Sequence, residues 1–234
     1  MLRQSIFAAL AIAAATGANG QVSASPATGK ANVYYEFKGA RLGMSLAEWK
    51  AAPASVWSAP IAAVRYGPSQ AVCSGDQATS GRFGLSLERS RAEEASNVVV
   101  CTYGRQAIGM AFKPWMNVPI SIGEFATREV RYKFLEGRMY EISIVTHTNL
   151  LKDVLDGLTA KWGKPDSVMN DTTQNRLGAT FPHTIQLWAN PVATVRLESP
   201  TRRIDELNVT YVTVDGAAKI RAVEKTINPD ANKM

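Results

Sequence analysis

The stretch VRYKFLEGRMYEISIV, residues 130–145, decides the fold class. Apolar residues alternate with charged or polar ones from Val130 to Phe134 and again from Tyr140 to Ile144. A period of two residues is typical of a strand that buries one face. The stretch therefore predicts an antiparallel hairpin with one apolar face, which another element must cover.

The length of the hairpin loop decides whether the two apolar sets share a face. A two-residue loop at 136–137 would place them on opposite faces, because a shift of one residue turns every side chain over. A three-residue loop at 135–137 pairs Tyr132 with Tyr140, and Gly137 then takes the left-handed position of that turn. We therefore expect the three-residue loop.

The segment after the hairpin predicts the helix that covers the sheet. Residues 149–162 carry one apolar stripe at helical spacing: Leu151, Val154, Leu155, Leu158 and Trp162. Thr148 or Asn149 is expected to cap its start, and Gly163 favours its end.

A second helix start lies upstream in LGMSLAEWKAAP, residues 42–53. Ser45 and Glu48 have the spacing of a capping box, and Pro53 ends the helix near Ala52. A helix this short depends on packing for its stability.

The remaining elements read as short strands and connections. The charged segment 88–96, with Glu93 and Glu94, reads as a solvated connection. Strands are expected at 71–73, 82–87, 98–103, 107–112, 176–181, 184–189, 194–198 and 207–214. Strand runs that follow single helices predict an α+β fold, here two diverged repeats of a helix followed by an antiparallel sheet, with the helices on one sheet face.

The chain divides into five segments. Residues 1–24 have a positive start, an apolar run and a small-residue cleavage site, which are typical of a secretory signal peptide. The other segments are a flexible mature N-terminus (25–36), a first repeat (37–146), a second repeat (147–216) and a weakly helical, frayed tail (217–234). We expect a periplasmic or secreted protein with no transmembrane segment and no lipid anchor.

Cys73 and Cys101 are the only cysteines in the chain. An even number of cysteines in an exported protein favours a disulfide. Closing a loop of about 29 residues would stabilise the fold by roughly 3–4 kcal/mol on the chain-entropy model.

The sequence contains few signs of catalysis. It lacks the common serine-nucleophile, zinc-protease and phosphate-loop motifs, so we expect no catalytic residue, metal site or cofactor. His147 and His183 are the only histidines, and each reads as an ordinary loop or strand residue. The net charge of +6 is scattered, whereas a nucleic-acid binder usually has a dense basic stripe, so we expect no nucleic-acid partner.

The residues Gly43, Met44, Ser45, Glu48 and Trp49 resemble the helix start of the BamE/SmpA outer-membrane assembly lipoproteins and of β-lactamase-inhibitor-like repeats. The stretches YKFLEGRMYEISI and LTAKWGKPD are similar to small exported bacterial proteins of tandem helix-plus-sheet build. The resemblance implies a protein-binding or envelope-scaffold role. The lipid-bearing cysteine of the assembly lipoproteins is absent here.

The segment FKPWMNVPIS, residues 112–121, is the best candidate for a binding surface. Its prolines predict a stiff connection that carries Phe112, Trp115 and Met116. The alternative for Trp115, which its pattern favours, is that it fills a satellite core under the sheet. Trp188 is a further candidate on a strand. We expect a non-enzymatic module that binds another cell-envelope protein; the alternatives are an exported hydrolase and a small-molecule or polysaccharide binder.

Overall fold

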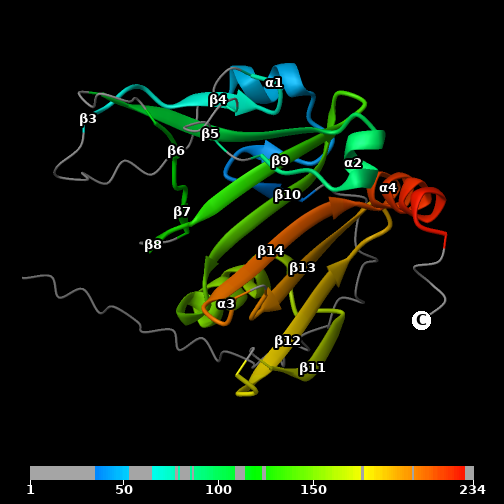
Figure 1. The fold of residues 1–234 in the computed structure, drawn as a ribbon. Helices are drawn as coiled ribbons and strands as arrows, with labels where there is room; N and C mark the ends of the chain where they lie inside the picture. The colour runs from blue at the N-terminus through cyan, green and yellow to red at the C-terminus, as the bar shows by residue number, and fades with distance from the viewer. Residues whose placement is uncertain are drawn as a thin grey trace, which may run out of the picture.

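A single ten-stranded antiparallel sheet forms the centre of the protein (Figure 1). The computed structural model describes residues 35–52, 65–76, 79, 85, 87–108, 114–122, 125–174, 177–201 and 203–229. The main path of the sheet has the order β11-β12-β13-β14-β10-β9-β5-β3, and β4 and β6 also pair with β5. The mixed α+β class expected from the sequence is confirmed.

The elements have the following bounds. The helices are α1 (Leu46–Ala51), α2 (Arg91–Ala95), α3 (Leu151–Trp162) and α4 (Val214–Ile227), with a 3₁₀ turn at Thr148–Leu150. The strands of the large sheet are β3 (Arg65–Tyr66), β4 (Gln70–Cys73), β5 (Val99–Ile108), β6 (Trp115–Asn117), β9 (Glu129–Leu135), β10 (Arg138–His147), β11 (Ser167–Gln174), β12 (Thr180–Ala189), β13 (Ala193–Ser199) and β14 (Glu206–Thr213). Two small hairpins pair β1 (Glu36–Phe37) with β2 (Ala40–Arg41) and β7 (Ser121–Ile122) with β8 (Phe125–Ala126).

The hairpin of β9 and β10 forms as expected, but the expected three-residue loop is wrong. Leu135 pairs with Arg138, so the loop is the two residues Glu136 and Gly137, both with positive φ (53° and 74°). Such a turn matches the right-handed twist of the strands. The register then shifts between Met139 and Glu141, and this β-bulge restores the pairing of Tyr132 with Ile142 on one face.

One face of the sheet, here called the helical face, packs against α1 and α3. Trp49 of α1 and Val154 and Leu158 of α3 belong to the main core cluster. The capping box of α1 is confirmed, because Ser45 Oγ accepts from the Glu48 N–H and Glu48 Oε2 accepts from the Ser45 N–H. No side chain caps α3, which instead follows directly from the 3₁₀ turn.

The opposite face, here called the open face, is covered at one end by α2 and α4, so the helices do not all lie on one face. Ile220 of α4 packs with Val98, Val100 and Tyr140 in a second cluster. Figure 1 shows α2 beside α4 at the ends of the strands, whereas α3 lies behind β13 and β14. The C-terminal segment, predicted as a weakly helical tail at 217–234, forms helix α4 as far as Ile227.

Several expected strands merge, and one was missed. β5 continues from the strand expected at 98–103 to Ile108, within the strand expected at 107–112, whose residues 109–112 lie outside the described ones. β12 extends to Thr180 through Pro182. Proline is tolerated there because β12 pairs only with β11 at that point, since its pairing with β13 begins at Thr184. β11 was not expected, because its polar sequence lacks apolar alternation. Most of the expected strand 82–87 lies outside the described residues.

The sheet has two halves that meet at their last strands. After α3, the consecutive strands β11-β12-β13-β14 form a meander; after α1, the pairing path is β4-β5-β9-β10, with β6, β7 and β8 between β5 and β9 in the chain. β10 and β14 pair antiparallel along Glu141–His147, which joins the halves into one continuous sheet.

The disulfide between Cys73 and Cys101 is confirmed. The two residues lie directly opposite each other on β4 and β5. Disulfides persist in oxidising compartments, so the bond indicates an extracellular or periplasmic environment. Within the described part of the chain, no helix has the length and apolar character needed to cross a bilayer.

Candidate functional site

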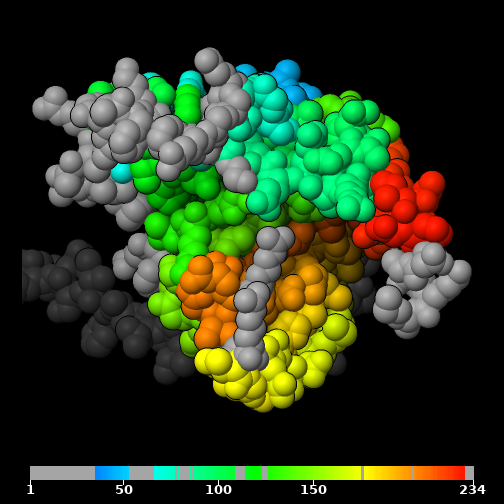
Figure 2. Space-filling model, viewed as in Figure 1, coloured from blue at the N-terminus to red at the C-terminus, as the bar shows by residue number. Residues whose placement is uncertain are grey.

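The part of the open face that α2 and α4 leave uncovered forms the candidate site. In Figure 2, the segment 85–95 and α4 occupy one end of this face, and β12 and β14 form much of the rest. A groove of about 780 Å³ lies on it. Its lining comes from five strands and their connections: Asn117, Arg128, Glu129, Arg131, Ser143, Val145, Glu198, Thr201, Arg203, Glu206 and Asn208.

Arg128 organises one end of the groove. Its Nη2 lies 2.7 Å from Asp205 Oδ2, and its Nη1 lies 2.8 Å from Glu206 Oε1. The hydrogen bond from Arg128 holds the pKa of Asp205 below its ordinary value. The same guanidinium lies against the imidazole of His147, with Nε 3.1 Å from Nε2. The connection between β13 and β14 is thereby tied to the start of β9.

A second polar group lies on β12 and β13. Glu198 Oε1 lies 3.2 Å from His183 Nε2, and Glu198 Oε2 lies 2.7 Å from Arg196 Nη1. Between the two groups, Ser143 Oγ donates to Asn208 Oδ1 at 3.1 Å. The groove lining contains three arginines and three glutamates, so its charge is balanced and does not form the basic stripe of a nucleic-acid binder.

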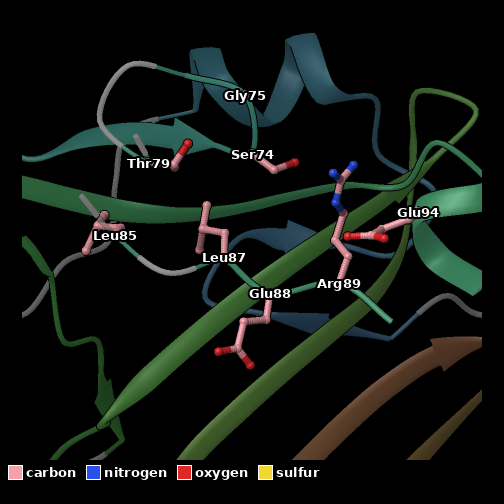
Figure 3. Close-up of a pocket in the computed structure, with 8 residues that line it drawn as sticks. All are labelled: Ser74, Gly75, Thr79, Leu85, Leu87, Glu88, Arg89 and Glu94. Carbon is pink, nitrogen blue, oxygen red and sulfur yellow. The ribbon is translucent and has the colours of Figure 1, made fainter. Parts of the chain in front are cut away.

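A separate recess of about 370 Å³ lies between the turn after β4 and the segment before α2 (Figure 3). Leu85 and Leu87 stand toward one end of it, and the charged side chains Glu88, Arg89 and Glu94 toward the other. Its two hydroxyls hold the backbone. Ser74 Oγ accepts from the Val100 N–H, and Thr79 Oγ1 donates to the Asp76 carbonyl. Their role is therefore structural.

A buried charged cluster joins α2 to the sheet. Lys133 Nζ lies 2.6 Å from Glu93 Oε1 and 2.9 Å from Glu141 Oε1. Burial opposes ionisation of Glu93, but hydrogen bonds from Lys133, Ser90 and Tyr140 outweigh it and lower its pKa. Burial raises the pKa of Glu141 despite Lys133. Glu93 is therefore not a solvated loop residue, as the sequence suggested.

The sequence-predicted binding residues do not form one surface. Trp115 is half-buried and packs on Val72 and Leu85, so it belongs to a satellite core. Met116 is 41% exposed. Trp188 is fully buried and donates its indole N–H to the Gly163 carbonyl at 2.8 Å, so its assignment as a contact residue is wrong. Phe112 lies outside the described residues.

Trp115 and Trp188 also lie far apart in the sheet order, on β6 and β12. Alternation does place Trp188 on the face away from Ile185 and Leu187, as the sequence indicated. That face is the helical one, which α3 covers, and this explains why Trp188 is buried.

The groove residues were missed as a site, although their strand faces carried a signal. Glu129 and Arg131 alternate with the apolar residues of β9, and Arg196 and Glu198 do so on β13. This pattern predicts a polar face for each strand. The pattern does not show that the pair β9 and β10 lies beside β13 and β14. In the chain, β11, β12 and β13 come between β10 and β14, yet β10 and β14 pair in the sheet.

No family model, curated protein or solved structure matches this chain.

Proposed function

We propose that this protein is a non-enzymatic binding module of the cell envelope, which recognises another protein through the open face of its sheet. The observation that carries the proposal is the 780 Å³ groove on that face, which several strands line with paired charged and amide side chains. Antiparallel sheets commonly bury one face and leave the other solvated. A rigid sheet also holds polar groups in fixed positions, which favours specific recognition.

Charge pairing within the groove supports a polar protein surface as the partner. Arg128 and Glu198 each hold two or more charged or imidazole neighbours, so their side chains are fixed before a partner arrives. Preorganised groups lose less conformational entropy on binding. Met116, at 41% exposure, lies between Trp115 and Asn117 on β6, so its side chain points away from the groove and is not part of this proposed surface.

The proposed compartment is the periplasm, reached by cleavage of a signal peptide at residues 1–24. The disulfide supports export, because such bonds form in oxidising compartments. The signal peptide itself lies outside the described residues.

We also propose that the two halves of the sheet derive from one duplicated helix-plus-sheet unit. Both halves follow a helix on the helical face, both contain a path of four antiparallel strands, and their fourth strands pair with each other, although β6, β7 and β8 are inserted between β5 and β9 in the first half. An antiparallel pair at the centre is compatible with a two-fold relation between the halves. The resemblance to the BamE/SmpA proteins and to β-lactamase-inhibitor-like repeats is part of this proposal.

Site-specific photo-crosslinking in intact cells tests the binding function. A photo-reactive amino acid at Val145, within the groove, is expected to capture one envelope protein. The same group at Lys152, whose side chain is 83% exposed on α3, serves as the control. Ser143→Arg fills the groove and should abolish capture without unfolding the protein. Equal capture from both positions, or none from Val145, would argue against the open face.

A further inference from the structure

Two adjoining cavities lie on the helical face, on either side of the turn between β1 and β2. The smaller, of about 210 Å³, is lined by Lys38, Gly39, Ala40, Trp49, Ala52, Tyr103, Ile120 and Tyr132. The larger, of about 400 Å³, lies between α3 and the sheet and shares Lys38 and Gly39 with the first. Neither cavity includes a residue of the open-face groove.

The smaller cavity is an aromatic one. The ring centroid of Trp49 lies 4.9 Å from the ring centroids of Tyr103 and Tyr132. The centroids of the two tyrosine rings are 5.8 Å apart. Trp49 is only 1% exposed and Tyr132 only 2%. Burial raises the pKa of both tyrosines, so their hydroxyls remain protonated donors.

Within the described part of the chain, neither Tyr103 nor Tyr132 has a hydrogen-bond partner for its hydroxyl, although both residues line the cavity. The indole N–H of Trp49 is also unpaired, but it is enclosed beyond the reach of a water molecule, as is that of Trp162 elsewhere in the core. By contrast, Tyr140 donates to Glu93 and Trp188 donates to Gly163. Polar groups in such sites normally have partners, so the two tyrosine hydroxyls lack an acceptor.

The larger cavity is mainly apolar, with charges at its edge. Its apolar lining is Phe37, Ile122, Ile144, Val154, Leu158, Val209 and Tyr211. Lys161 lies 3.5 Å from Glu36, whereas Lys38 has no carboxylate partner among the described residues. Asp153 lines the α3 side and disfavours an anion there. Lys38 and the tyrosine hydroxyls are thus at the aromatic cavity. The apolar walls belong to the larger cavity.

We propose that the two cavities together bind one single-chain carboxylate amphiphile of the fatty-acid class. The carboxylate accepts hydrogen bonds from the hydroxyls of Tyr103 and Tyr132 near Lys38, and the aliphatic chain lies between α3 and the sheet. Burial of the chain supplies affinity in proportion to its apolar area. The buried donors supply specificity, because they have no other partner.

Gly157 of α3 lies at the solvent-exposed edge of the larger cavity. A Cβ built on it meets nothing within 4 Å. The absence of a side chain keeps this edge of the cavity open. A leucine at this position projects into the space assigned to the chain.

Isothermal titration with dodecanoate, below its micelle concentration at pH 7, tests the proposal. Dodecanoate is expected to bind with one site per chain. Dodecylammonium has the same tail but a cationic head that only donates hydrogen bonds, and it is expected not to bind. Absence of dodecanoate binding, or equal binding of the two amphiphiles, would overturn the proposal and leave ordered water as the partner of these donors.

Two variants locate the head and the tail. Tyr132→Phe removes one donor but keeps the ring, and it should weaken dodecanoate binding roughly 10- to 100-fold. Tyr140→Phe removes a hydroxyl on the opposite face and should leave the affinity unchanged. Gly157→Leu should also weaken binding, while an unchanged melting temperature shows that it folds. Unaltered affinity in Tyr132→Phe or Gly157→Leu contradicts the assigned pose.

Discussion

The hydroxyl of Tyr140 donates a hydrogen bond to Glu93 Oε1 across 2.9 Å, which joins β10 to α2. Glu93 Oε2 accepts at the same time from the Ser90 N–H at 2.7 Å, so one carboxylate both caps its own helix and fixes it to the sheet. Lys133 completes the contact from β9. This short helix therefore depends on a single buried side chain for its position.

Glu93→Ala should destabilise the protein strongly. The change removes the helix cap and leaves Lys133 and Tyr140 with one acceptor fewer in a buried site. Breaking a buried ion pair by removing one partner typically costs about 3–5 kcal/mol. Urea denaturation measures the loss. Glu94→Ala is the matched control, because Glu94 is exposed and should change the stability by less than about 0.5 kcal/mol.

The contribution of Glu93 should depend on pH. Its pKa lies below the ordinary value of 4.5 in the folded protein, so its stabilising effect is present above that value and is lost as the pH falls through the folded pKa. Glu141 acts in the opposite sense, because its folded pKa is raised and the stability it contributes at low pH is lost as the pH rises through it. Lys133 and Tyr140 stay protonated over this range.

The measurement is the difference in unfolding free energy between the parent protein and Glu93→Gln. Both proteins retain Glu141, so the difference reports Glu93 together with the effect of its charge on the pKa of Glu141. It should be constant from about pH 7 to pH 5.5 and shrink below pH 4.5. A difference that grows on acidification would mean that Glu93 is protonated in the native state.

The face of the sheet on which Tyr140 lies could not be predicted from the sequence. Alternation along 140–144 suggested that Tyr140 shares a face with Ile142, yet the bulge turns it to the opposite face beside Val98 and Val100. A bulge adds one residue to a strand without a distinctive local signal. The sequence predicted the hairpin and the covering helix α3 correctly, because these follow from local periodicity, whereas the loop length and the residue pairs of the hairpin were wrong.

The site depended on contacts that periodicity does not encode. Ser90 and Glu93 have the capping-box spacing, so α2 was open to prediction from the sequence, but its burial depends on Lys133 and Tyr140 some 40 or more residues away. The groove likewise forms only when β14 pairs with β10. Strand polarity is a local property, whereas the order of strands is a global one.

Reduction of the disulfide should lower the stability substantially. Cys73 and Cys101 close a long loop between adjacent strands, and the chain-entropy model gives a loss of roughly 3–4 kcal/mol. Urea denaturation with and without dithiothreitol measures it. The double variant Cys73→Ser, Cys101→Ser should show no response to the reductant, and an equal response in both proteins would point to another cause.

Two glycines in helices should respond oppositely to alanine. In Gly216→Ala of α4, the new Cβ would lie 2.6 Å from Tyr140 Cβ, so the helix must move off the sheet. Overpacking of this kind costs about 1–3 kcal/mol and should exceed the gain in helix propensity of roughly 0.8–1.0 kcal/mol.

In Gly157→Ala of α3, nothing lies within 4 Å of the added Cβ, so only the gain in helix propensity remains. The melting temperature should therefore rise in Gly157→Ala and fall in Gly216→Ala. A rise in both variants would show that α4 does not pack against Tyr140 as closely as described. It would also weaken the view that α2 and α4 are held to the open face together, because Tyr140 is the side chain that both helices contact.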